Sequence, residues 1–194
     1  MWHGVSVIGK PTGELITLTK LKQRLRIDHN DDDDLLGDLL KQAIARVDGP
    51  SGIGVAMMKQ TWRKSLDCFP AHILLPGAPV KQVTKISYVD AAGVTQEIQP
   101  TAYRCDVTSE PARVEAAYGA FWPSTRDIIG AVSVEYELGE DDAAAVPPDL
   151  ISAVCMVVAH WYQTGGAVAD GNLKEVPLGA QWILDEHSRG HVAA

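Results

Sequence analysis

The sequence has few cysteines, no excess of basic residues and no long apolar run. Its three cysteines, Cys68, Cys105 and Cys155, are odd in number and widely spaced, which argues against a disulfide framework or a zinc finger. We expect three reduced, buried thiols that pack as small hydrophobic side chains. The longest apolar stretch, residues 150–159, is far shorter than the roughly 18–20 residues needed to span a bilayer. We therefore expect no membrane partner.

Positive charge is also scarce. The 194 residues include 17 Lys and Arg against 25 Asp and Glu, which gives a formal net charge of −8. Tight, sequence-independent binding of nucleic acid needs a basic footprint, so this balance argues against it. It does not exclude a surface that nucleic acid passes without sticking. The N-terminus lacks the basic start and apolar core of a secretory signal, so we expect the protein to stay in the compartment where it is made.

Catalytic signatures are missing as well. The sequence contains no G-x-S-x-G, no phosphate-binding G-x-x-x-x-G-K-[ST] and no G-x-G-x-x-G. His187 and His191 have a spacing that zinc ligands on a helix could use, but no third ligand is near them. We therefore expect no catalytic residue, no metal site and no cofactor.

Six aspartates lie between residues 28 and 38. A calcium loop that starts at Asp32 would have Gly37 at its sixth position, but Leu36 would fall at the fifth and Ala43 at the twelfth, where oxygen ligands are required. The better interpretation is that these carboxylates lie in the first turn of a helix, where the helix dipole favours negative charge.

Helical periodicity marks both ends of the chain. Near residues 17–27, Leu18, Leu21 and Leu25 recur at helical spacing after a possible cap at Thr17 or Thr19, although alternation over 20–27 would also permit a strand. Residues 31–48 carry an apolar stripe that ends at a Gly-Pro pair. Residues 148–164 are apolar almost all round, which predicts a helix packed on several sides. A short helix or an extended tail is expected from residue 178 onward.

The middle of the chain has the period of β-strands. Val132, Val134, Tyr136 and Leu138 alternate with polar residues, and residues 86–89 lead through a glycine-containing turn into 94–98, as in a hairpin. The fold class expected is α+β: a small helical bundle with an antiparallel, β-rich insertion at about 60–139. We divide the chain into an extended arm (1–16), a single domain (17–164, with a helical core at 17–50 and 147–164), and a loop with a C-terminal segment (165–194).

Several segments, taken in order, carry a resemblance to a known family. They are LRIDHNDDDDLL, ILLPGAPVKQVTKISYVDAAG, YRCDVTSEPARVEAAYGAFWPSTRDIIGAVSVEYELG, VPPDLISAVCMVVAHWYQTGG and VPLGAQWILD. Each is weakly specific alone, but their order and spacing over residues 17–186 resemble the phage head–tail connector (adaptor) family, in the version with a β-rich insertion. Gene transfer agents use a similar part.

The resemblance implies a structural role in the virion neck, after assembly in the host cytoplasm. Members of the family form a ring of about twelve copies beneath the portal protein, extend the channel for double-stranded DNA, and dock the stopper or tail-terminator protein. DNA is expected to pass through without specific binding. The alternatives are another neck part, such as a stopper or tail-completion protein, or an enzyme of unrecognised type.

The C-terminal segment is the candidate for portal docking. Leu178, Trp182 and Ile183 are apolar residues in an otherwise polar segment that follows a glycine-containing loop. That composition is typical of a peptide that orders on binding. The alternative is that Trp182 covers the core of its own subunit.

Overall fold

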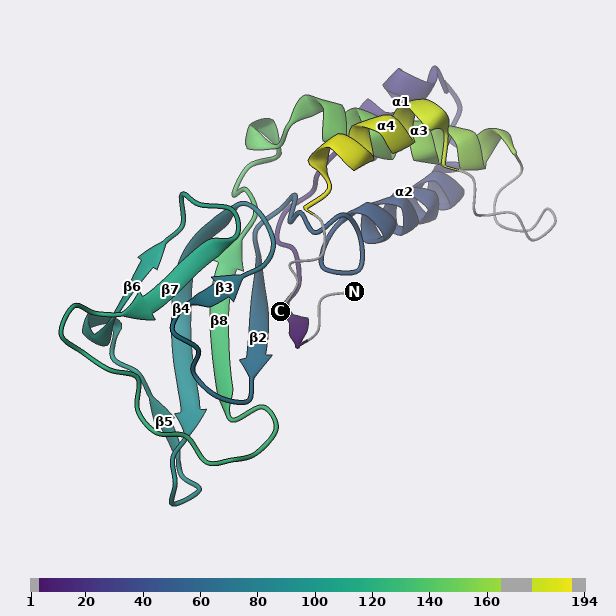
Figure 1. Cartoon of the computed structure of the whole chain (residues 1–194). Coiled ribbons are helices and arrows are strands. Elements are labelled where there is room, and N and C mark those ends of the chain that lie inside the picture. Colours follow the sequence, from purple (N-terminus) through teal and green to yellow (C-terminus); the bar gives the residue numbers. More distant parts are fainter. Residues whose placement is uncertain (1–3, 165–175, 190–194) are drawn as a thin grey trace. The chain divides into compact units, whose positions relative to one another are not determined.

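The computed structural model describes residues 4–164 and 176–189. These residues fold as two compact units. The β unit comprises residues 4–12 and 59–139, and the helical unit comprises residues 13–58, 140–164 and 176–189 (Figure 1). In the sequence, most of the β unit is inserted between the two halves of the helical unit. The predicted α+β class with a β-rich insertion is confirmed.

The helical unit contains the four expected helices. Their bounds are α1 (Leu18–Leu25), α2 (Asp33–Val47), α3 (Pro148–Gln163) and α4 (Leu178–His187). Thr17 caps α1, because its hydroxyl oxygen accepts a hydrogen bond from the backbone N–H of Lys20 at 3.2 Å. Of the two interpretations left open for this segment and its cap, the helix and Thr17 are correct. A short 3-10 turn, Ala143–Ala145, precedes α3.

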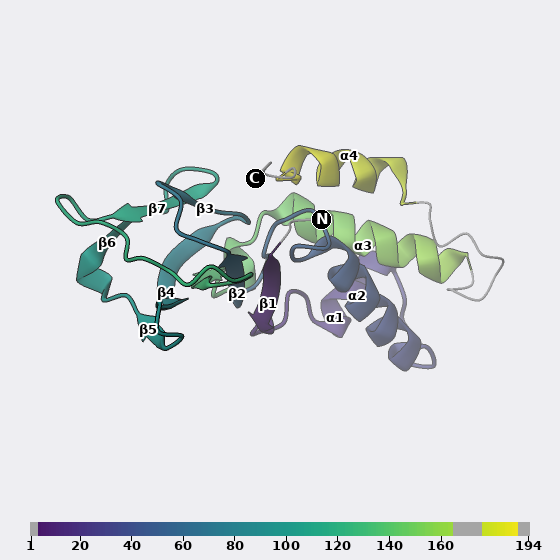
Figure 2. The same ribbon diagram turned by 60° about the horizontal axis from the view of Figure 1, so that its bottom comes forward.

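The core of the helical unit is formed by the inward stripes of its helices. Leu36, Leu39 and Ala43 of α2 are buried in one hydrophobic cluster, which also contains Val154, Val158 and Trp161 of α3. Helix α4 lies along α3, as Figures 1 and 2 both show, and it buries Ala180 and Leu184 in the same core. The wide apolar face of α3 therefore packs against neighbours on more than one side.

Two antiparallel sheets form the β unit. The larger has the strand order β1-β2-β8-β4-β5, and the smaller has the order β3-β7-β6. The bounds are β1 (Val5–Gly9), β2 (Gln60–Leu66), β3 (Ile73–Leu75), β4 (Val80–Val89), β5 (Thr95–Glu97), β6 (Tyr103–Asp106), β7 (Ala112–Ala116) and β8 (Val132–Leu138). Strand β1 lies within the segment that was expected to be an extended arm. The predicted hairpin is confirmed, because Val89 of β4 pairs with Thr95 of β5.

Strand β8 is the centre of the larger sheet. The alternation read from the sequence is confirmed, because Val132, Val134, Tyr136 and Leu138 are fully buried while the residues between them are half-buried. The hydroxyl of Tyr136 donates to the carbonyl of Pro76 at 2.8 Å, which ties the segment after β3 to this face of the sheet. Burial raises the pKa of the Tyr136 phenol far above its usual range, so it stays a neutral donor.

The prediction of three buried thiols is wrong for two of them. All three cysteines are free, but Cys68 and Cys105 are exposed and only Cys155 is buried. Cys68 lies beyond the end of β2, so the alternating burial of that strand does not reach it. Cys105 lies on β6, an edge strand of the smaller sheet, where no further strand among the described residues covers it.

Candidate docking surface

Helix α4 presents two large apolar side chains to solvent. Leu178 is 89% exposed and Trp182 is 71% exposed. They lie four residues apart, so they share one side of the helix. Ile183 is half-buried and packs against the helical core. Of the three residues expected to dock, Leu178 and Trp182 are therefore on the open face of α4, and Ile183 lies at its boundary.

The position of α4 is fixed by contacts at its C-terminal end. Nε2 of His187 lies 2.7 Å from Oδ2 of Asp149, in the first turn of α3. The hydrogen bond from His187 is the main cause of a lowered pKa of the Asp149 carboxyl, and the N–H of Leu150 contributes to the same shift. The carboxylate of Asp149 is also favoured by its position in the first turn of α3, where the helix dipole stabilises negative charge. Leu178 and Trp182 are thus exposed on a helix that is packed against α3. Trp182 does not cover the core of its own subunit.

Helix α3 extends this apolar surface. Met156 is 42% exposed, and its Sδ lies 3.8 Å from the point where a Cβ atom on Gly179 of α4 would stand. The solvent-exposed side of a helix in a monomeric protein is normally polar. Leu178, Trp182 and Met156, hereafter the α4 patch, are therefore a candidate protein-binding surface.

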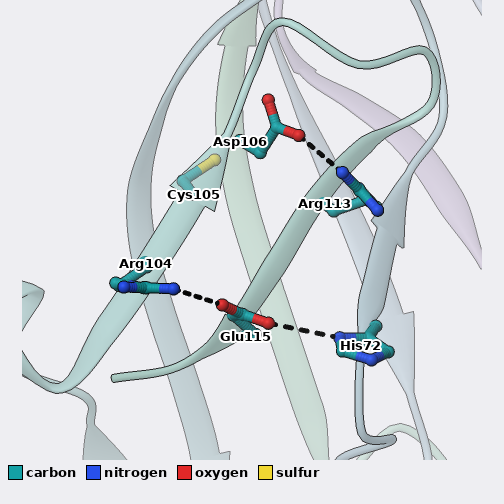
Figure 3. A pocket seen from close by; sticks show the side chains of 6 residues that line it. All are labelled: His72, Arg104, Cys105, Asp106, Arg113 and Glu115. Carbon is teal, nitrogen blue, oxygen red and sulfur yellow. Dashed lines mark hydrogen bonds and ion pairs between the residues drawn. The ribbon is translucent and has the colours of Figure 1, made fainter. Parts of the chain in front are cut away.

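A charged hollow lies on the smaller sheet of the β unit (Figure 3). It has a volume of about 420 Å³, and Figure 3 shows its basic side chains directed at its acidic ones. Arg104 is 2.9 Å from Glu115, His72 is 3.5 Å from the same carboxylate, and Arg113 is 2.8 Å from Asp106. Because these charges neutralise one another, the hollow offers no basic footprint for nucleic acid.

The thiol in this hollow is not an activated nucleophile. Loss of hydration, with a smaller effect of the Asp106 carboxylate, raises the pKa of Cys105, which keeps the thiol protonated. Hydrogen bonds from Thr108 and Arg113 hold the pKa of Asp106 well below its usual range. Among residues 4–164 and 176–189, no group of three His, Cys, Asp or Glu side chains is arranged to hold a metal ion.

The aspartates at the start of α2 make structural contacts. Asp33 is 2.6 Å from the Nζ atom of Lys22 on α1, and Asp32 accepts a hydrogen bond of 2.6 Å from the hydroxyl of Tyr162 on α3. The bond to Asp32 raises the pKa of the Tyr162 hydroxyl. These carboxylates therefore connect α2 to α1 and α3, and they also place negative charge at the N-terminus of α2. Periodicity gave no signal for the contact with Tyr162, which is 130 residues away in the sequence.

The net negative charge of the chain comes from one unit alone. The sequence of the β unit carries nine Lys or Arg and nine Asp or Glu, so its net charge is zero. Residues 13–58 and 140–190 carry eight basic and sixteen acidic residues, which accounts for the full −8. Only the division into units reveals this partition, because basic and acidic residues are interspersed along the whole sequence.

Comparisons with known proteins agree with the resemblance read from the sequence. A family described as phage gp6-like head–tail connector proteins matches residues 15–70, which span α1, α2 and the start of the β-rich region. No curated protein matches the sequence. The chain resembles head–tail connector proteins, and the recognition from the sequence is confirmed.

Solved structures match over nearly the full length. One is a chain from the neck of an empty gene transfer agent particle computed with C6 symmetry, and another is from the virion of a native gene transfer agent particle. Each is 25% identical, has a TM-score of 0.74, and aligns over 98% of this chain and 97% of its own. A third, from the neck of a native particle computed with C12 symmetry, is 26% identical with a TM-score of 0.65, over 96% of this chain and 98% of its own.

Proposed function

We propose that this chain is the adaptor of the neck of a tailed phage or a phage-like particle. In this role it is a structural protein of the virion that joins the host-assembled capsid to the tail. About twelve copies form a ring beneath the portal protein, extend the DNA channel, and dock the stopper or tail-terminator protein. The proposal assigns the chain no catalytic step and no cofactor.

The observation that carries the proposal is the full-length similarity to a neck chain of gene transfer agent particles. Both units take part in it, since the alignment spans 98% of this chain at a TM-score of 0.74. A likeness limited to the helices would be weaker support, because small helical bundles serve many unrelated functions. The head–tail connector family that matches residues 15–70 points to the same role.

The charge of the chain suits a channel that DNA must traverse. Twelve copies at −8 each would give a ring with roughly −100 charges, and such a surface repels phosphates instead of holding them. Since the whole of this charge is on the helical unit, we assign the repulsion of DNA to that unit. The β unit, with its paired charges, contributes no net attraction.

We assign portal docking to the α4 patch. Leu178 and Trp182 are apolar anchors of the kind that contribute most to protein interfaces, and they are presented by a helix that is already ordered. Ile183, the third predicted anchor, supports them from the boundary with the core. Binding through an ordered helix avoids much of the entropy cost of ordering a free peptide.

The experiment is to produce the chain together with the portal protein of the same genome and to image the complex. The proposal requires a ring of this chain on the portal. A Leu178→Ser, Trp182→Ser double variant should lose the ring, and Leu35→Ser, a change at a 46% exposed apolar residue of α2, should keep it. If the wild-type chain does not bind the portal and is found only at the tail end of a neck, the stopper or tail-completion role replaces the adaptor role. If the double variant binds normally, the α4 patch is not the portal contact.

A further inference from the structure

The loop that joins β7 to β8, residues 117–131, exposes four large apolar side chains, and three of them are more than nine-tenths exposed while Ile128 is 42% exposed. Tyr118 is 98% exposed, Phe121 is 92% exposed and Ile129 is 94% exposed. These are the highest exposures among the large hydrophobic residues in the described part of the chain. Single exposed apolar residues are normal on a protein surface, but four on one loop of fifteen residues need an explanation.

The loop is held in place by the rest of the β unit. The Trp122 ring stacks on the Phe69 ring with centroids 4.7 Å apart and planes 5° apart, and Phe69 in turn meets Tyr88 of β4 edge to face. Three backbone N–H groups also donate across the unit: Ala117 to the carbonyl of Ala102 (2.9 Å), Arg126 to the carbonyl of Val89 (2.9 Å) and Gly130 to the carboxylate of Asp67 (2.7 Å). The exposed side chains are therefore displayed by an anchored loop.

The composition of the loop is that of a protein interface. Its ionisable side chains are Tyr118, Arg126 and Asp127, so at neutral pH it carries one positive and one negative charge. The centres of protein interfaces are likewise depleted of charge and enriched in aromatic residues. Nucleic acid is a poor occupant, because a single arginine gives almost no counterion release.

We propose that this loop contacts a second copy of the same chain. The argument is electrostatic: two helical units, each at −8, repel one another, whereas two β units with zero net charge do not. A surface with no net charge and exposed apolar groups favours self-association. Contacts between copies are therefore least opposed in the β unit, and this loop is its most apolar exposed part. The inference rests on the proposed function, in which it supplies a lateral contact of the ring.

The test is sedimentation velocity of the full chain, without portal, over a wide range of protein concentration and at two salt concentrations. The Debye length is about 10 Å at 0.1 M salt and about 3 Å at 1 M, so salt should weaken the repulsion between helical units and leave the apolar contact intact. We expect a weak self-association that becomes stronger at high salt. A Tyr118→Ser, Phe121→Ser variant should associate at least about tenfold more weakly, because two anchor residues are lost. Leu35→Ser is the control and should associate as the wild type does.

Unchanged association of the loop variant would overturn the inference, and so would a wild-type chain that remains monomeric at high salt. A stable dodecamer of the wild type at low salt would also contradict it, because repulsion would then not limit assembly. The proposed function is judged separately, by wild-type binding to the portal. If the loop variant self-associates normally but loses the portal or the tail-side protein, the loop belongs to that partner, and the adaptor role still stands.

Discussion

Replacement of Trp161 by alanine tests the assignment of α3 as the central helix of the core. Trp161 is 6% exposed, and removal of a large buried aromatic side chain typically costs about 3–5 kcal/mol. Its Nε1–H group is buried and has no hydrogen-bond acceptor within the described structure. An unpaired buried donor is itself unfavourable by about 1–3 kcal/mol, and the alanine variant is relieved of that cost. We therefore expect a net loss of about 3 kcal/mol, at the lower end of the range.

The matched variant is Trp161→Phe. Phenylalanine keeps a ring in the core and has no N–H group to leave unpaired, so we expect it to stay within about 1 kcal/mol of the wild type. Urea unfolding followed by circular dichroism at 222 nm measures both variants, because this signal reports mainly the helices. For a chain of this size the alanine variant should melt about 6–12 °C lower. A loss below about 1 kcal/mol for alanine, or equal losses for the two variants, would refute the reasoning and place Trp161 at an interface instead.

Three further predictions concern the start of α2, the contact of His187 with Asp149, and the glycine at position 77. Asp32→Asn and Asp33→Asn should each lower stability by a few tenths to about 1 kcal/mol through a weaker helix start, and millimolar calcium should not raise the melting temperature of the wild type; stabilisation by calcium that vanishes in the double variant would contradict this. The pKa of Asp149 is lowered by His187, so its contribution to stability is present above the ordinary carboxyl pKa and is lost as the pH falls through the folded value. Acid titration of Asp149→Asn, followed by circular dichroism, should show a smaller loss of stability below about pH 4 than the wild type shows, and identical curves would argue against the contact. Gly77 has a φ of +95°, and an added Cβ would lie 2.5–3.0 Å from buried side chains, so Gly77→Ala should cost about 2 kcal/mol or more in urea unfolding, and a neutral effect would contradict the geometry.

The elements of the fold could be predicted because each has a local cause. The stripe of α2 and the alternation of β8 depend only on which residues recur at 3.6 or 2 positions, and both are found where the pattern predicts them. Burial at the ends of elements could not be predicted in this way. Cys68 continues the parity of β2 in the sequence, but the strand ends at Leu66, so its side chain is exposed.

The candidate docking surface was predicted only in part. The composition of the C-terminal segment indicated Leu178, Trp182 and Ile183, but not which of them would face solvent. That depends on the rotation of α4 against α3, which is fixed by the burial of Ala180 and Leu184 and by the contact of His187 with Asp149. The exposed side chains of the β7–β8 loop gave no signal at all, because an apolar residue in a loop is equally compatible with burial.

The sequence by itself determined the α+β class, the helices at residues 31–48 and 148–164, the β-rich middle, the net charge and the resemblance to head–tail connectors. All of these follow from composition, short-range periodicity or the order of segments along the chain. Only the tertiary structure decided which apolar residues are exposed, which aspartates pair with distant partners, and how the charge divides between the units. The physical reason is that burial and electrostatic pairing depend on distances in space between residues that are, like Asp32 and Tyr162, far apart in the sequence.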